Sequence, residues 1–275
     1  MKSIKFRLVK IIEKIPFIQL FIYNNLNKFK FLLPHDKDYH ALELIFKKEE
    51  SRSFLDVGGN NGVSTLGFRQ LGYKSNKIII FEPDPFLIKK YLNNIKNKYK
   101  KISIFNFGLS FKNSNEYIYQ AYYKEKHFHF NNSFDLKYIR SKLKHNYPDK
   151  FKSFKIKKKK LNLKNYDQMN FNENVCFIKI DVEGFDHLVI LGMKKLIKKF
   201  LPVFLIEYNH SNFLKIYNIL CKNYYCYRYL FDKNKLLKLN IKNINKLKKG
   251  IITIDNYNKN SINVFFIPKK FKMLK

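Results

Sequence analysis

Residues 55–62 read LDVGGNNG, a short apolar run that ends in glycines. The run begins at residue 53 and is typical of a buried strand, and residues 61–71 after it have a helical pattern. The chain has only nine glycines, and five of them lie between Gly58 and Gly72. A chain this poor in glycine keeps it where the backbone needs a positive φ or a close approach, so this loop is expected to be more than an ordinary turn.

Apolar runs typical of strands recur along the rest of the chain. They lie at 77–81, 102–107, 175–180, 203–207, 224–230 and 262–267. Helical patterns separate the first five strands, an alternation that indicates a parallel sheet covered on both faces. We predict an α/β fold, namely a Rossmann-like, doubly wound sheet of seven strands whose last strand is antiparallel. In such sheets the ligand lies at the carboxyl ends of the strands.

The predicted domain organisation is an N-terminal helical extension at 1–45 and one domain at 46–275. The strand–helix rhythm breaks between 111 and 170, which we interpret as an insertion at about 111–160 followed by an edge strand and a short helix. A second excursion, basic and rich in Asn, covers 232–260.

The N-terminal residues 1–33 are apolar and basic, but charged residues from Lys10 to Lys14 interrupt them before a bilayer-spanning length is reached. Two interpretations stay open: an amphipathic helix on a membrane surface, or a helix packed on the domain.

The chain is strongly basic, with 55 Lys and Arg against 21 Asp and Glu and a formal charge of +34. Only five of these residues are Arg, whereas proteins that read base edges favour Arg for its bidentate fork. The abundance of Lys, Asn, Ile and Phe is typical of an AT-rich genome. We therefore predict no specific nucleic-acid partner, although peripheral attraction to an anionic membrane surface remains open.

The chain has three cysteines, Cys176, Cys221 and Cys226, and no C-x-x-C pair. This pattern indicates a reducing compartment and no zinc site. Because no cleavable leader pattern is present, we expect a cytoplasmic protein.

Acidic residues gather at the ends of the predicted strands. Seven of the 21 lie there: Asp56, Glu82, Asp84, Asp181, Glu183, Asp186 and Glu207. Capping of the following helix can explain Asp84 and Asp186. It explains Glu82 and Asp181 less well, since each directly ends an apolar strand.

The glycine loop does not have the spacing of a dinucleotide site. A G-x-G-x-x-G pattern starting at Gly58 would need glycines where Asn60 and Val63 stand. Asp56, just before the loop, suits a positively charged ligand better than a diphosphate. S-adenosylmethionine carries a sulfonium, an ammonium and a ribose diol but no phosphate, and is the ligand we predict.

Four motifs in order resemble the FkbM family of methyltransferases: LDVGGNNG (55–62), FEPDP (81–85), FGLS (107–110) and FIKIDVEGFD (177–186). The resemblance covers residues 40–268, with Gly59 where the family usually has Ala and Asp186 where it usually has Glu. It implies a class I methyltransferase fold and methyl transfer to oxygen, with sugars, polyketides or surface-glycan precursors as acceptors. We therefore expect a small-molecule or glycan acceptor.

The expected cofactor-binding residues follow from these motifs. They are Asp56, Gly58, Gly59, Asn60, Gly62, Glu82, Pro83, Leu109, Ser110 and Asp181. The glycines are expected to admit the methionine portion and Asp56 to lie near its ammonium. Glu82 is expected to bind the ribose hydroxyls, as an acid after the second strand does in related sheets. Leu109 and Ser110, as the resemblance suggests, border the adenine.

Catalysis needs an acceptor oxygen aligned with the methyl group and a site for the proton that the alcohol loses. The catalytic candidates are Asp181, Glu183, Glu207 and His210. Each is open to a second interpretation as a local cap or a solvated side chain. A metal site formed by Asp181, Glu207 and His210 is a further alternative, but the spacing is not diagnostic.

Two other function classes compete with an O-methyltransferase. The charge suggests an RNA or DNA methyltransferase, but the fourth strand ends in D-V-E-G and not in the N/D-P-P-Y type common among enzymes that methylate base nitrogens. A cofactor-free binding module is disfavoured by the intact glycines and acids.

Overall fold

The computed structural model describes residues 15–25, 28, 33–208, 210–240 and 263–274. The chain forms two compact units. The larger consists of residues 33–114 and 162–275, and the smaller of residues 1–32 and 115–161. The predicted elements within 1–14 and 241–262 lie outside the described residues.

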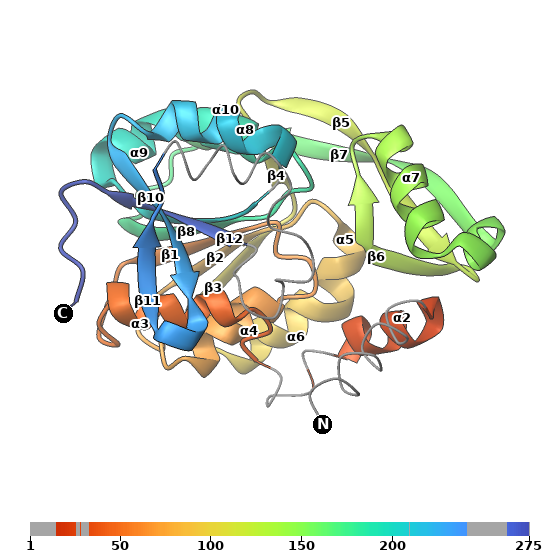
Figure 1. Cartoon of the computed structure of the whole chain (residues 1–275), viewed down its shortest axis with the longest axis horizontal. Coiled ribbons are helices and arrows are strands. Elements are labelled where there is room, and N and C mark those ends of the chain that lie inside the picture. Colours follow the sequence, from red (N-terminus) through yellow and green to blue (C-terminus); the bar gives the residue numbers. More distant parts are fainter. Residues whose placement is uncertain (1–14, 26–27, 29–32, 209, 241–262, 275) are drawn as a thin grey trace. The chain divides into compact units, whose positions relative to one another are not determined.

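The larger unit is built on a mixed sheet in the order β11-β10-β12-β9-β8-β1-β2-β3 (Figure 1). Its strands are β1 (Ser53–Val57), β2 (Ile78–Phe81), β3 (Ile102–Phe105), β8 (Val175–Ile180), β9 (Val203–Glu207), β10 (Tyr224–Leu230), β11 (Lys235–Lys238) and β12 (Asn263–Pro268). The run from β3 to β9 is parallel, and β12 is antiparallel to both of its neighbours. The predicted doubly wound sheet with an antiparallel last strand is therefore confirmed.

The sheet has one strand more than predicted. β11 lies in the segment predicted as an excursion and pairs antiparallel with β10 at the sheet edge. The pattern KLLK is too short and too polar to stand out as a strand, and it forms one because β10 offers an unpaired edge.

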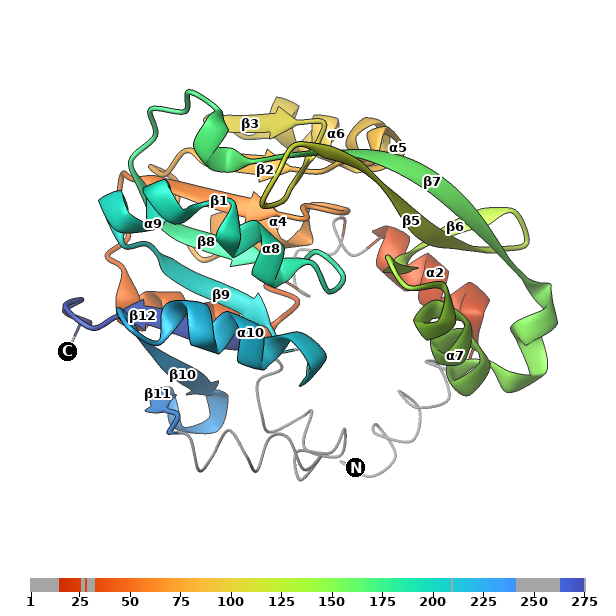
Figure 2. The same ribbon diagram turned by 90° about the horizontal axis from the view of Figure 1, so that it is seen from above.

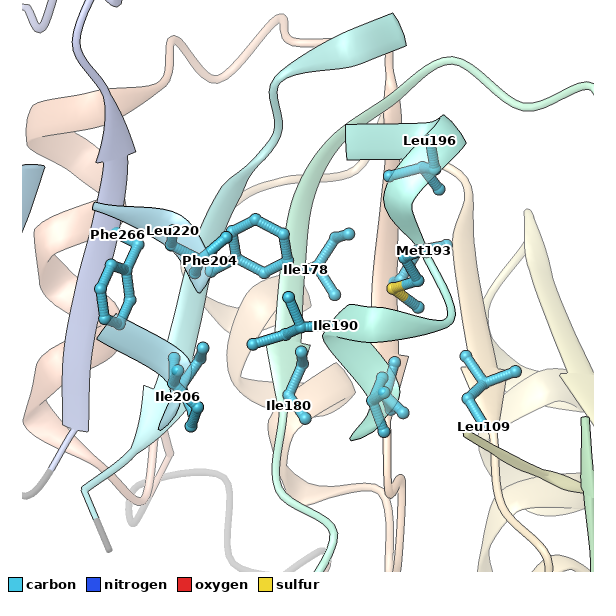
Figure 3. Close-up of a cluster of buried hydrophobic side chains, with 14 of the residues drawn as sticks. Leu109, Ile178, Ile180, Ile190, Met193, Leu196, Phe204, Ile206, Leu220 and Phe266 are labelled. Carbon is cyan, nitrogen blue, oxygen red and sulfur yellow. The ribbon is translucent and has the colours of Figure 1, made fainter. Parts of the chain in front are cut away.

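Helices cover both faces of the sheet. They are η3 (Lys37–Ala41), α3 (Leu42–Ile45), α4 (Val63–Gln70), α5 (Pro85–Leu87), η4 (Ile88–Leu92), α6 (Asn93–Lys98), η6 (Tyr166–Gln168), α8 (Asp186–Leu191), α9 (Lys194–Phe200), α10 (His210–Leu220) and η7 (Phe231–Lys233). Helices α8, α9 and α10 lie along one face (Figure 2), and α3, α4 and α6 pack on the other. Figure 3 shows how Ile190 and Met193 pack against Ile178 and Ile180 of β8.

The helix predicted over 185–199 is broken into α8 and α9. The break follows Gly192, where an added Cβ would lie 2.1 Å from the carbonyl oxygen of Ser110. The chain is therefore pressed against the segment after β4 (Gly108–Leu109) at this point, and this contact is distant in sequence.

The smaller unit contains the insertion. Its elements are β5 (Ser114–Tyr123), β6 (Lys126–Ser133), α7 (Leu136–Asn146), η5 (Pro148–Ser153), most of β7 (Phe154–Lys164) and α2 (Pro16–Asn25). β5 and β6 form an antiparallel hairpin. β7, predicted as an edge strand, is an inner strand in the order β4-β7-β5-β6, so that prediction was wrong. Its residues Phe154 and Ile156 pack against the core of the smaller unit, although four consecutive lysines follow them.

Helix α2 packs on the insertion. Leu20 is 2% exposed and joins the core that contains Phe128 and Tyr147. The ring of Tyr23 stacks on Phe130 with 4.1 Å between centroids. Within the part of the chain that the structure describes, no helix is long and apolar enough to cross a bilayer.

Candidate active site

The glycine loop is pressed between β2 and the end of β8. Gly58 has a φ of +84°, and its N–H donates to the carbonyl of Phe81 at 2.9 Å. A Cβ added to Gly58 would lie 2.0 Å from the backbone oxygen of Asp181. Added at Gly59 or Gly62, it would meet an isoleucine side chain at 2.2 Å. Packing within the protein therefore requires these glycines, and their contact with a cofactor stays a prediction.

Glu82 fastens this loop to the end of β2. Its Oε2 accepts from the Asn60 N–H and its Oε1 from the Asp84 N–H, both at 2.8 Å. Asp84, and not Glu82, caps the next helix, by accepting from the Phe86 N–H. Burial of Glu82 raises its pKa to about 7. Each carboxylate oxygen has a further lone pair, so the group can still receive ribose hydroxyls.

The segment after β3 lies against the same edge. Asn106 donates from Nδ2 to the carbonyl of Glu82 at 3.2 Å. A Cβ on Gly108 would be 3.5 Å from the ring of Pro83, so FEPDP and FGLS are neighbours in the fold. Leu109 and Ser110 are both 2% exposed, and the Ser110 N–H donates to Lys164.

Four charged side chains share one face of the sheet at its carboxyl edge. Lys179 lies in register with Asp56 on β1 and with Leu205 on β9. Asp181 and Glu207 each come two residues later, so the alternation of side chains puts them on the same face. The Lys179 Nζ lies 3.0 Å from Asp181 Oδ2, and Glu207 hydrogen-bonds to Asp181. The sheet thus brings together candidate site residues from three separate segments of the sequence.

Asp56 is fully buried beside this group. Its Oδ2 accepts from the Thr65 hydroxyl at 2.7 Å, whereas its Oδ1 has no hydrogen-bond partner among the described residues. Burial raises the pKa of Asp56, and the charge of Lys179 opposes this rise. A buried carboxylate oxygen without a donor is costly, so the site fits a ligand or a water that brings one.

The proton balance of the cluster follows from its charges. Burial would raise the pKa of Asp181, but the Lys179 ammonium holds it below its ordinary value. The negative charge of Asp181 raises the pKa of Glu207 to about 8. At neutral pH Asp181 is thus a carboxylate, and Glu207 keeps its proton and donates a hydrogen bond to Asp181. Asp181 is a weak base in this state, and the more basic carboxylate is Glu207.

His35 and Lys179 also belong to this cluster, and neither was predicted as a site residue from the sequence. The His35 Nε2 lies 3.4 Å from Asp36 Oδ2. Burial lowers the pKa of His35, so its ring is neutral at pH 7, and Asp181 and Lys179 are both close enough to influence it. The available signals were the cluster HDKD at 35–38 and a lysine inside the otherwise apolar run VCFIKI.

The two remaining catalytic candidates are Glu183 and His210. Glu183 has a φ of +55° in the loop after β8, and its charge contributes to the raised pKa of Glu207. His210 begins α10, but its side chain lies outside the described residues. In the described part of the chain, no group of three or more His, Cys, Asp or Glu side chains is arranged to hold a metal ion.

Comparison with known proteins supplies the family. A model of the methyltransferase FkbM domain matches residues 56–229. None of the curated proteins matches the chain.

Among solved structures, an FkbM methyltransferase from Methylobacillus flagellatus KT is 15% identical with a TM-score of 0.46, and the match covers 89% of this chain and 59% of that one. An S-adenosylmethionine-dependent O-methyltransferase from Thermotoga maritima is 10% identical with a TM-score of 0.41, and the match covers 85% of this chain and 65% of that one. A precorrin-6y C5,15-methyltransferase from Geobacter metallireducens GS-15 is 8% identical with a TM-score of 0.40, and the match covers 84% of this chain and 86% of that one.

The matched segment begins at Asp56 and contains Glu82, Asp181 and Glu207, the residues that meet at the carboxyl edge of the sheet. It also spans more than half of the chain. The chain belongs to the FkbM family of methyltransferases.

Proposed function

We propose that this chain transfers the methyl group of S-adenosylmethionine to a hydroxyl of a sugar, a glycan precursor or another small molecule. The observation that carries the proposal is the pair Asp181 and Glu207, which are hydrogen-bonded to each other at the carboxyl ends of β8 and β9. Transfer to an alcohol must remove a proton from the acceptor, and a carboxylate pair with one proton to exchange suits that task.

The cofactor, when bound, supplies a methyl group on a positively charged sulfur. Glu82 receives the ribose hydroxyls, and the unpartnered Oδ1 of Asp56 accepts from a donor of the methionine portion or from a bridging water. Leu109 and Ser110 border the adenine. These assignments use carboxylates where the ligand carries donors and positive charge, which agrees with its chemistry.

Bound S-adenosylmethionine would supply the acceptor oxygen with an electrophilic methyl group and would leave as a neutral thioether. Asp181 orients the acceptor by accepting the hydrogen bond of its hydroxyl. Its low pKa makes it a weak proton acceptor, so the proton passes to Glu207 once that group is ionised. Because the negative charge of Asp181 raises the pKa of Glu207 to about 8, the rate is expected to rise with pH through that value.

A label-transfer experiment tests this function. The purified chain is incubated with methyl-labelled S-adenosylmethionine and panels of sugar nucleotides, free glycans and transfer RNA, at several pH values from 6 to 9. Label in a hydroxyl-bearing small acceptor, with a rate that rises through about pH 8 and a rise that E207Q abolishes, supports the proposal. Label only in RNA would instead support the nucleic-acid alternative suggested by the charge of +34.

A salt titration on a polyuridine column separates the two alternatives further. A nucleic-acid enzyme retains its affinity at physiological salt, whereas attraction through surface lysines alone is lost. Retention of the chain at that salt would contradict a small-molecule acceptor.

A further inference from the structure

Helix α2 exposes apolar side chains on one side. Phe17 and Phe21 are each 57% exposed, and Ile15, just before the helix, is 40% exposed. The two phenylalanines are four residues apart and therefore lie next to each other on the helix surface. Single exposed apolar residues are ordinary, but a contiguous pair of rings on one helix marks a contact surface.

The opposite side of α2 holds the helix in place, so the exposed rings have a rigid support. Pro16 and Leu20 are buried, and Leu20 belongs to the core of the smaller unit. Gln19 hydrogen-bonds to Tyr147, and Tyr23 stacks on Phe130. Because these contacts orient α2, the side chains of Phe17 and Phe21 cannot simply turn inward.

The insertion that packs against α2 is rich in basic residues. The Lys126 Nζ lies 5.4 Å from the centre of the Phe17 ring, and Lys124 at the same hairpin tip is exposed. Residues 115–161 carry 13 Lys and Arg against 4 Asp and Glu in 47 residues. The larger unit carries 35 against 16 in 196 residues, so the basic excess per residue is about twice as high in the insertion.

We propose that α2 and the neighbouring hairpin tip form a docking surface for an anionic lipid bilayer. Phenylalanine and isoleucine side chains enter the boundary between headgroups and acyl chains, and lysines beside them bind anionic headgroups. The charge around the helix is complementary to that surface.

Two other occupants fit less well. Bases stack on aromatic rings that line a basic groove, where cations track the phosphates, whereas these rings stand on a helix that has no charged residue of its own. A second copy of the chain would bring the same basic surface against itself, and like charges repel.

Vesicle co-sedimentation of the full chain tests the proposal. Vesicles of phosphatidylcholine alone are compared with vesicles of phosphatidylcholine and phosphatidylglycerol. We expect binding to the anionic vesicles only. F17A/F21A should weaken it by about tenfold or more, because it removes the inserted apolar area and keeps every charge. Raising salt from 0.1 M to 1 M, which shortens the Debye length from about 10 Å to about 3 Å, should weaken it as well.

The matched control is F86A/F111A in the larger unit. Both of these phenylalanines are 43% exposed, and each has a lysine beside its ring, Lys90 at 5.2 Å and Lys112 at 5.4 Å. This variant should bind vesicles like the unaltered chain. If both double variants bind equally well, or the unaltered chain does not bind anionic vesicles, the proposal is wrong.

Four further measurements separate the outcomes. Circular dichroism checks that F17A/F21A remains folded. A dimer that F17A/F21A dissociates in light scattering, or polyuridine binding that the same variant removes, would assign the surface to a second copy or to RNA. Calorimetric titration should show the same S-adenosylmethionine affinity for F17A/F21A and for the unaltered chain. If the unaltered chain does not bind the cofactor at all, the proposed function is refuted, whereas the lipid result stands.

Discussion

Glu82 offers a prediction in which the structure sets both the sign and the size of the effect. The residue is 5% exposed, and burial raises its pKa from an ordinary 4.5 to about 7. In the unfolded chain the group ionises near its ordinary pKa. Between these two values the folded state binds the extra proton, so stability falls as the pH rises from 4.5 to 7 and then levels off. The total loss corresponds to about 3 kcal/mol.

The substitution E82Q removes this titration. A glutamine oxygen can accept from only one of the two N–H groups, of Asn60 and Asp84, that the carboxylate now binds, so one buried hydrogen bond is lost at a cost of about 1–2 kcal/mol. At pH 5, where the folded chain carries a neutral Glu82, E82Q should therefore be the less stable protein. At pH 8 the unaltered chain carries the buried charge, and E82Q should be the more stable by about 1–2 kcal/mol.

Urea unfolding followed by circular dichroism at both pH values measures this reversal. E49Q, at an exposed carboxylate, corrects for the change in net charge. A stability difference between E82Q and the unaltered chain that has the same sign and size at pH 5 and pH 8 would refute the reasoning. Calorimetry at pH 8 should also show S-adenosylmethionine binding to E82Q weakened by about 1–3 kcal/mol, through the lost charge-assisted bonds to ribose.

Three other substitutions test the remaining parts of the site. D181N should leave S-adenosylmethionine affinity within a few-fold and lower the rate of label transfer by about 10²-fold, because the acceptor loses the carboxylate that orients it; unchanged rate and affinity would show that Asp181 only orders its loop. K179M should destabilise the chain in urea unfolding at pH 7, because Asp181 and Asp56 lose their counter-ion, by less than the about 3–5 kcal/mol of a fully buried pair, since the Asp181 side chain is 40% exposed; an unchanged stability would contradict that pairing. G58A should destabilise the chain several times more than G72A in thermal unfolding. Both glycines have a positive φ, but an added Cβ would lie 2.0 Å from a backbone oxygen at Gly58 and 3.7 Å from a lysine side-chain carbon at Gly72. Equal effects would mean that the strain of a positive φ alone decides the loss of stability.

Local patterns alone determined the framework of this protein. A run such as KIIIF is short and rich in isoleucine, which favours an inner strand over a helix, so most strands and helices of the sheet were readable before any contact was known. The same runs place Glu82 and Asp181 at strand ends, and parallel strands bring those ends to one edge. The motifs identify the family because each combines a strand end with the residues that a ligand at that edge requires.

The tertiary structure decided the chemistry of the site. Whether Asp181 acts as a base depends on Lys179 two residues before it, on Glu207 from another strand, and on His35 from a segment about 140 residues away. Only the sheet register brings Lys179, Asp181 and Glu207 onto one face, and the charges of these neighbours, together with burial, set their pKa values. The same applies to the broken helix at Gly192 and to α2 on the insertion. Proximity between distant segments depends on how the whole chain packs, and no short pattern encodes it.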